Sequence, residues 1–270
     1  MQPILDLVGH HPATWSIVAI DLRDERRIVE HSPDQILKTA SVPKILLLWE
    51  ISSRLDTGAL KPDLLIDRRS TAQVGDSGIW QHLAVDSLPL TDVAAFVGAF
   101  SDNLATNALI DLVGLDPLTD TAEKLGCTHT RLNDYVRDHR LPGTHPGSIS
   151  QGTSRELASL CAELEMSSRN GATTAGRVVE WLRHGVDYSM VLNTFGLDPL
   201  SHYEPENGVR VWSKTGTDAG VRADVGVIEG AATSVAYSVI ANWEPDTVAV
   251  EDILECMGNI GNLIRNYCAG

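Results

Sequence analysis

Apolar positions recur with a short period near both ends of the chain, which predicts strands there. Residues 14–22 are rich in β-branched side chains and partly alternate, and Ile28 and Val29 follow a charged turn, so this segment predicts a β-hairpin. Further strands are predicted where Val, Ile, Tyr or Trp accumulate again. These stretches are 208–214, 222–229 and 233–242.

Between about residues 41 and 200 the pattern becomes mainly helical. Apolar helices are predicted over 44–55, 91–100 and 103–113, the last closed by Gly114. The stretch 153–156 reads Thr-Ser-Arg-Glu, a capping box that predicts the start of another helix. A final amphipathic helix is predicted from apolar residues that share one face. They are Ile253, Met257, Ile260 and Ile264.

This order of elements predicts an α/β (α+β) fold. An antiparallel sheet with flanking helices is built from both chain ends, and an all-helical lobe is inserted between them. We expect one domain over 1–270 with two lobes, an α/β lobe of 1–40 plus 205–270 and a helical lobe of 41–204. A ligand cleft is then expected where the lobes meet.

Composition and charge narrow the possible partners. The 270 residues carry a formal net charge of −15, and no basic stripe is present to neutralise phosphates, which argues against nucleic acid. The longest strongly apolar run, 45–49, is far shorter than the roughly 20 residues needed to span a bilayer, so no membrane partner is expected. We expect a monomer acting on a small molecule.

The N-terminus and the cysteines bear on localisation. No basic segment followed by an apolar one opens the chain, so the sequence as written predicts a cytoplasmic protein, or a secreted one if a leader was trimmed. The four cysteines show no CxxC spacing and are expected to be buried free thiols; a disulfide is the alternative in a secreted protein. Only one adjacent histidine pair (10 and 11) and no HExxH occur, so no metal or other cofactor is expected.

Three short motifs carry candidate chemistry. The first reads Ser41-Val42-Pro43-Lys44 at the start of a predicted helix. Three residues of separation bring Lys44 to the helical face of Ser41, so an amine can accept the proton of a hydroxyl nucleophile. The helix dipole favours negative charge developing at Ser41. The alternative is a helix-capping serine followed by a solvated lysine.

The second motif, Ser101-Asp102-Asn103, lies between two predicted helices. Ser101 can relay a proton to a departing group there, and Asn103 can hydrogen-bond a substrate amide or Lys44. The alternative is a turn that caps the helix beginning after it.

The third motif, Lys214-Thr215-Gly216-Thr217, ends a predicted strand. Gly216 would clear space for a substrate lying along that strand. Lys214 and Thr215 can bind a carboxylate, and the backbone N–H of Thr217 can pair with that of Ser41 as an oxyanion hole. The alternative is a strand that simply runs into a hairpin turn.

These motifs, in this order, resemble the penicillin-recognising serine enzymes and specifically the class A β-lactamases. The resemblance covers nearly the whole chain. It extends to Gly78-Ile79-Trp80-Gln81-His82-Leu83, to 101–107, and to Gly126 followed by Thr130-Arg131-Leu132.

The resemblance implies a β-lactamase/transpeptidase-like fold and a role for each motif residue. Ser41 is then the acylated nucleophile and Lys44 its general base, while Ser101 and Lys214 serve proton transfer and electrostatics. The implied substrate-binding residues follow. They are Asn103, Thr215, Gly216, Thr217 and Arg222, the last similar to an arginine that fixes a substrate carboxylate or else a surface arginine.

The chain departs from the family pattern in the loop after Leu132. Val136 falls where class A enzymes carry the glutamate that activates the deacylating water, and Asp134 replaces the arginine whose salt bridge shapes the loop. The substitute bases considered are Asp134, Asp138 and His139, against a solvated loop whose acids pair locally with Arg131 and Arg137.

The function expected from the resemblance is that of a serine hydrolase that acylates Ser41 with β-lactam, amide or ester substrates and deacylates β-lactams slowly. One alternative is an esterase, peptidase or acyltransferase with a non-lactam substrate. The other is a module that binds or is acylated by a ligand without turnover.

Overall fold

A five-stranded antiparallel sheet in the order β2-β1-β10-β9-β8 forms the centre of the computed structural model, which describes residues 2–9, 11–201 and 207–270. Because β1 pairs with β10, with Thr14 opposite Asn242, the two ends of the chain meet in one sheet, which confirms the predicted architecture. The predicted lobe boundary at 204/205 lies outside the described residues. The strands are β1 (Thr14–Asp21), β2 (Arg26–His31), β8 (Arg210–Asp218), β9 (Val221–Glu229) and β10 (Ser234–Asn242).

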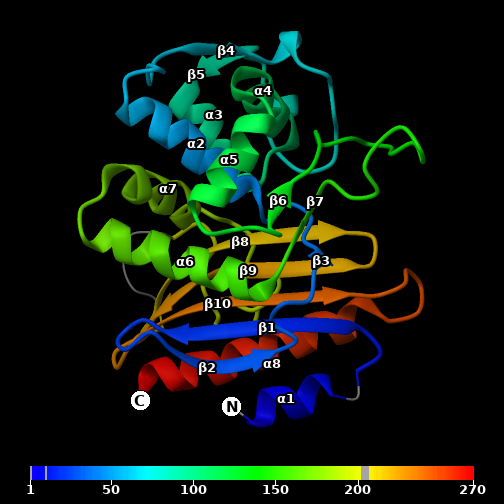
Figure 1. The fold of residues 1–270 in the computed structure, drawn as a ribbon, viewed down its shortest axis with the longest axis vertical. Coiled ribbons are helices and arrows are strands. Elements are labelled where there is room, and N and C mark those ends of the chain that lie inside the picture. The colour runs from blue at the N-terminus through cyan, green and yellow to red at the C-terminus, as the bar shows by residue number, and fades with distance from the viewer. Residues whose placement is uncertain (1, 10, 202–206) are drawn as a thin grey trace.

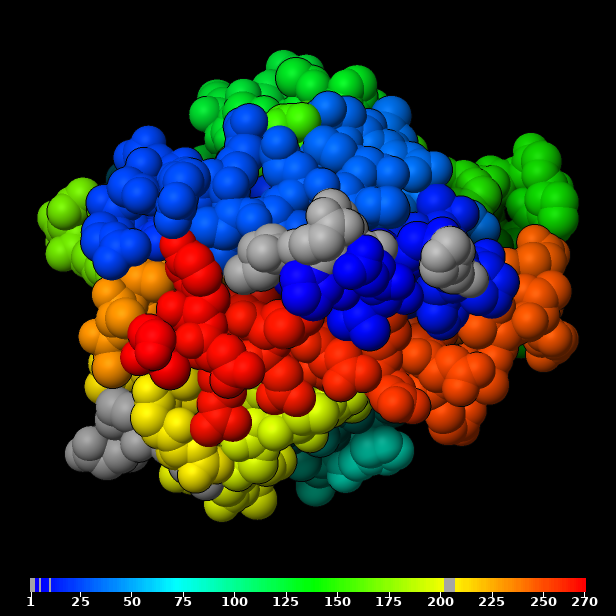
Figure 2. Space-filling view, turned by 90° about the horizontal axis from the view of Figure 1, so that it is seen from below, coloured from blue at the N-terminus to red at the C-terminus, as the bar shows by residue number. Residues whose placement is uncertain are grey.

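Alternation along β1 supplies apolar side chains to both faces of the sheet. Trp15 and Ile17 pack in a core with residues of the C-terminal helix α8 (Val250–Ala269), while Val18 packs with Ala158 on the opposite face. The short helix α1 (Gln2–Val8) lies against α8 on the same side, and the two run next to each other in the view from below (Figure 2).

The central part of the chain is helical, as predicted, and gathers above β8 and in front of the sheet (Figure 1). Helix α6 packs against β1, β9 and β10 and links the sheet to α7. The helices of this part are α2 (Lys44–Asp56), α3 (Leu90–Phe100), α4 (Asn103–Val113), α5 (Asp116–Lys124), α6 (Ser154–Arg169) and α7 (Thr173–Arg183), with single 3₁₀ turns at Arg68–Ser70 and Trp80–His82.

The structure contains several short strands that the pattern did not predict. β3 (Leu37–Lys38) and β6 (Arg131–Leu132) flank β7 (Ser150–Gly152) in a small sheet. A second pair joins β4 (Leu65–Asp67) to β5 (Ser87–Pro89). The β6–β7 pairing brings together the two ends of the irregular segment 133–149, so that segment is anchored as a closed loop.

Two local expectations need correction. Thr153 does cap α6 by accepting from the Glu156 N–H, but the Glu156 carboxylate turns away and accepts from the backbone N–H groups of residues 128–130. The third motif does not end its strand, because β8 continues through Asp218, which pairs with Val221 across a turn containing Gly220 at φ +66°. The four cysteines are buried free thiols, as expected.

Candidate active site

The nucleophile candidate Ser41 lies in the turn that leads into α2. The Lys44 N–H donates to the Ser41 carbonyl oxygen at 3.2 Å, and no side chain caps the start of α2. Ala40, just before, holds a left-handed φ of +47°, an uncommon conformation for a residue with a Cβ. The capping-serine interpretation is therefore wrong, and the Ser41 side chain is half-buried at the cleft.

Lys44 is fully buried, with 0% of its surface exposed. Its Nζ donates to the Ser101 carbonyl oxygen at 2.7 Å and to Asn103 Oδ1 at 2.9 Å, and lies 3.3 Å from Ser101 Oγ. Burial, together with the neighbouring charge of Lys214, holds the pKa of Lys44 well below its usual value. The alternative of a solvated lysine is therefore wrong.

The Ser101-Asp102-Asn103 connection combines both predicted roles on different residues. Asp102 is structural: its carboxylate accepts from the Ala105 N–H at the start of α4 and from the N–H groups of Ile79 and Trp80. Ser101 and Asn103 instead face Lys44, and Ser101 does so from a left-handed backbone conformation with φ +54°. The Asp102 contacts hold the connection while its neighbours serve the site.

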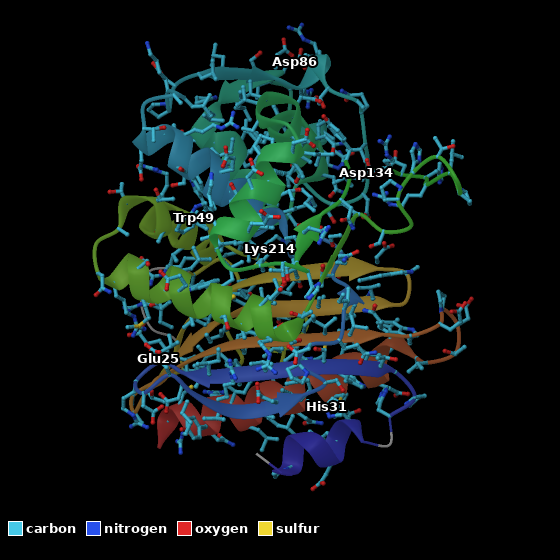
Figure 3. The ribbon with its side chains drawn as sticks, viewed as in Figure 1. Glu25, His31, Trp49, Asp86, Asp134 and Lys214 are labelled. Carbon is cyan, nitrogen blue, oxygen red and sulfur yellow. The ribbon has the colours of Figure 1, made fainter. Side chains whose placement is uncertain are left out.

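Lys214 reaches the same serine from the sheet. It lies on the terminal strand β8, where the sheet meets the helices (Figure 3). Its Nζ donates to Ser101 Oγ at 2.9 Å and to the Thr215 carbonyl oxygen at 2.8 Å. Burial lowers the pKa of Lys214 to about 8, partly offset by Asp187 and Asp224. Ser101 Oγ therefore lies within hydrogen-bonding distance of two buried amines, each with a lowered pKa.

Gly216 is required by the close approach of two backbones. A Cβ at this position would lie 2.2 Å from the Thr39 carbonyl oxygen and 3.1 Å from the Ser41 nitrogen. The glycine therefore lets β8 lie directly beside the turn of the nucleophile, a different reason from the predicted space for substrate. Thr217 follows at the cleft.

Arg222, opposite Thr217 in β9, is turned along the hairpin. Its Nη1 donates to the carbonyl oxygens of Asp218 and Val221, and the guanidinium lies 5.9 Å from the centre of the Trp243 ring. Burial lowers the pKa of Arg222, and the negative charge of Asp187 partly offsets this decrease.

Two acids at the site had no predicted role. Asp187, between α7 and β8, accepts from the Thr215 hydroxyl at 2.7 Å. Asp224 lies on β9 behind Lys214, fully buried, and accepts from Tyr237 OH and the Val191 N–H; burial raises its pKa to about 8. Neither belongs to a recognisable motif, so no sequence signal marks them.

Two neighbouring cavities open beside Ser41. The first, about 270 Å³, is lined by Ser101, Asp187, Lys214 and Thr215, among others. The second, about 250 Å³, is lined by Asn103, Val136, Asp138, Arg137 and Arg140, among others. Ser41, Ser77 and Thr217 line both.

Val136 is held in the second cavity by its backbone. Asn107 accepts from the Val136 N–H and donates to the Val136 carbonyl oxygen, each at 2.9 Å. Asn107 falls in the stretch 101–107 that resembles the family, but it had no predicted role. The backbone at 136 is therefore fixed while its side chain presents only an apolar surface to the cavity.

Asp134 also shapes the loop, since both of its carboxylate oxygens are bound. Arg137 and Arg140 contact it at 2.8–2.9 Å, and the Tyr135 N–H donates to it at 2.8 Å. Asp134 is 5% exposed and its pKa is lowered by these partners against the effect of burial. The loop thus keeps a salt bridge of its own. The expected Arg137 pair is confirmed, whereas Arg131 donates to the Thr128 carbonyl oxygen instead.

The other two acid–base candidates of the loop differ in position. Asp138 accepts from the Gly75 N–H at 2.9 Å and lines the second cavity with Ser41. His139 is exposed and lines a neighbouring hollow outside it. Within 2–9, 11–201 and 207–270, no group of three or more His, Cys, Asp or Glu side chains can hold a metal ion, and no helix there is long and apolar enough to cross a membrane.

Comparison with known proteins identifies the family and the fold of the chain. A family model described as the β-lactamase enzyme family matches residues 1–268. The structure of a β-lactamase from Sphaerobacter thermophilus superposes with a TM-score of 0.82 at 23% identity, covering 97% of this chain and 94% of that one.

Two further structures are similar. PBP-A gives a TM-score of 0.81 at 19% identity, covering 98% and 94% of the two chains. The chromosome-encoded β-lactamase of Vibrio parahaemolyticus gives 0.79 at 18% identity, covering 98% and 97%. At these identities the likenesses show a shared fold.

Proposed function

Because the chain belongs to the β-lactamase enzyme family, we propose that it is a serine hydrolase that forms an acyl-enzyme on Ser41 with β-lactam, amide or ester substrates. The proposal further holds that a β-lactam-derived acyl group leaves slowly.

The burial of Lys44 carries this proposal. A fully buried ammonium is costly, and the partners of its Nζ, Ser101 and Asn103, supply no negative charge. The neutral amine is therefore favoured, and a neutral amine one helical turn from Ser41 is a general base. A lysine kept only for solubility or capping would not be placed here.

Acylation then follows from the contacts. Ser41 Oγ attacks the substrate carbonyl carbon while Lys44 Nζ accepts its proton, and the N–H groups of Ser41 and Thr217 are proposed to stabilise the oxyanion. On collapse, the bond from the carbonyl carbon to the leaving nitrogen or oxygen breaks. The proton returns from Lys44 through Ser101 Oγ, 3.3 Å away, to the leaving atom. Lys214 supports this relay by donating to Ser101.

The remaining site residues are proposed to bind the substrate. Asn103 and Thr217 line the cavities beside Ser41, and Thr215 lies next to Lys214. Gly216 acts by bringing β8 close to Ser41, and Arg222 contributes positive charge from the next strand.

Slow deacylation is proposed from the second cavity. Hydrolysis needs a base that removes a proton from water as the water attacks the ester, and the Val136 side chain cannot act as a base. Asp134 is bound on both oxygens by Arg137 and Arg140, so it is a poor substitute. Asp138 is the candidate that shares this cavity with Ser41.

The test is intact-protein mass spectrometry with penicillin G, combined with nitrocefin and small-ester kinetics. We expect a persistent adduct on Ser41, absent in Ser41→Ala. The control is Ser77→Ala, which removes a hydroxyl lining the same cavities and should still be acylated. Rapid multiple turnover of penicillin without an adduct would contradict slow deacylation.

The same variants separate the two remaining functions. Small-ester turnover that is lost in Ser41→Ala identifies an enzyme, including one whose natural substrate is not a lactam. Ligand binding that is unchanged in Ser41→Ala, with no turnover in the native protein, would instead identify a binding module and contradict the proposal.

A further inference from the structure

Asp187 lies in the part of the first cavity where Lys214 and Thr215 would meet a substrate. Its Oδ2 accepts from the Thr215 hydroxyl at 2.7 Å, and its Oδ1 accepts from the hydroxyl and the N–H of Ser189 at 2.6 and 3.1 Å. These donors lower the pKa of Asp187 despite its burial, with support from Lys214. The subsite therefore contains a fixed negative charge of the protein itself.

This charge partly offsets the cations that a substrate carboxylate would need. Asp187 interacts favourably with Lys214, whose Nζ is held between Ser101 and Thr215. It also interacts favourably with Arg222, whose guanidinium is bound to backbone oxygens of the hairpin. An incoming carboxylate would meet cations that Asp187 already partly compensates and would lie beside another carboxylate.

The hydrogen-bonding capacity of Thr215 leads to the same conclusion. A hydroxyl has one proton to donate and two lone pairs to accept with. Because the Thr215 proton is directed at Asp187, its oxygen is left as an acceptor toward the cavity. An acceptor beside an anion suits a ligand group that donates hydrogen bonds, such as an ammonium, an amide N–H or a hydroxyl.

We propose that Asp187 is a specificity-determining residue that occupies the carboxylate subsite as an internal anion, so that the protein prefers substrates whose leaving group is cationic or neutral over those whose leaving group is a carboxylate. The leaving group is the relevant side because Ser101, its proposed proton donor, is bound to Lys214 next to Thr215 and Asp187. The inference rests on the proposed acylation of Ser41.

The experiment uses three aryl acetates that transfer the same acetyl group and differ only in the charge of the leaving phenol. They are para-(aminomethyl)phenyl, para-(hydroxymethyl)phenyl and para-(carboxymethyl)phenyl acetate. In the native protein, kcat/KM for the ammonium ester should exceed that for the carboxylate ester by about tenfold or more, the size expected for one charge at close range. A native protein that prefers the carboxylate ester would overturn the proposal without any variant.

Asp187→Asn should raise the carboxylate-to-ammonium ratio of kcat/KM by about tenfold or more, and should speed the acylation of Ser41 by penicillin G. Asp187→Glu keeps the charge and should keep the native order. The control Asp120→Asn removes one acid from the exposed surface of α5, so it changes the net charge equally and should leave the ratio unchanged. An equal rise in Asp187→Asn and Asp120→Asn would overturn the proposal.

Turnover of the hydroxymethyl ester distinguishes a failure of the Asp187 proposal from a failure of the proposed function. If Ser41→Ala abolishes its turnover while Asp187→Asn leaves the charge preference unchanged, the acyl-enzyme stands and the role of Asp187 is wrong. If Ser41→Ala leaves turnover intact, the proposed function itself fails.

Discussion

The two cavities beside Ser41 differ in the chemical groups that line them. Ser101 and Lys214 line the first, and the amine of Lys214 and that of the fully buried Lys44 both contact Ser101. In the second, the backbone N–H and carbonyl oxygen of Val136, which we propose stands in place of a water-activating acid, are both bound by Asn107. In our proposal the first cavity has the groups needed for acylation, whereas the second has a fixed loop but no base at position 136.

In this protein the shape of the loop around Val136 does not depend on the side chain at that position. The bonds that set the loop come from Asn107 to backbone atoms and from Asp134 to two arginines, and none involves the side chain at 136. A substitution at 136 can therefore change the chemistry of the second cavity without rebuilding it. Variants at positions 136, 134 and 224 test whether the two cavities are independent.

Val136→Glu should have the largest effect, because it places a base in a cavity that Ser41 already lines. We expect the lifetime of the penicillin adduct to shorten by about a hundredfold, the usual contribution of a general base, with acylation little changed. Stopped-flow acylation and time-resolved mass spectrometry measure the two steps. Val136→Gln is the control, with similar size but no base. An unchanged adduct lifetime in Val136→Glu would mean that water does not approach from this cavity.

Asp134→Asn should act on stability. Removing one partner of a buried ion pair is costly, and the partial exposure of both arginines reduces the cost, so we expect the unfolding free energy at pH 7 to fall by about 2 kcal/mol. Because the folded state lowers the pKa of Asp134, its contribution is present above the ordinary carboxyl pKa and is lost as pH falls through the lowered value.

Chemical denaturation of native protein and Asp134→Asn at pH 7 and pH 3 measures this effect, and the difference should shrink at pH 3. Asp138→Asn, an exposed acid of the same loop, should change stability by less than about 0.5 kcal/mol. Acylation of Ser41 should survive in both variants. Its loss in Asp134→Asn would show that the two cavities are not independent after all.

Asp224→Asn should give the smallest change, which is in the pH dependence of stability. The pKa of Asp224 is raised from 3.8 to about 8, so the folded state keeps a proton that the unfolded state has released. Native stability should therefore fall relative to the variant as pH rises through this window, by at most about 1.4 kcal/mol per pH unit. Denaturation at pH 6 and pH 7 tests the slope. Parallel slopes for the two proteins would show that Asp224 is ionised in the fold.

Local pattern predicted much of this molecule, and its limits are physical. The sheet from both ends and the helices α2, α3 and α4 follow from periodicity. The contacts of Lys44 with Ser101 and Asn103 join residues 57 and 59 apart, so local spacing does not give them, and the expectation that these residues share one site came from the three motifs taken together. Asp187 belongs to none of these motifs, so its hydrogen bond with Thr215 could not be predicted. Gly216 was correctly singled out, but the Thr39 backbone that requires it comes from another element.

The pairing of β1 with β10 has a consequence for synthesis on the ribosome. The strand that contains Thr14 can pair with β10 only after Asn242 has been synthesised. The turn at Ser41 and the nearby Ser101 likewise contact β8 only after Gly216 and Lys214 have been synthesised. Contacts so distant in sequence form slowly and leave earlier segments exposed. A nascent chain therefore carries its nucleophile from the first sixth of translation but has no working site until the last strands emerge. The yield of active protein is then expected to depend on how well these early segments are protected until the last strands emerge.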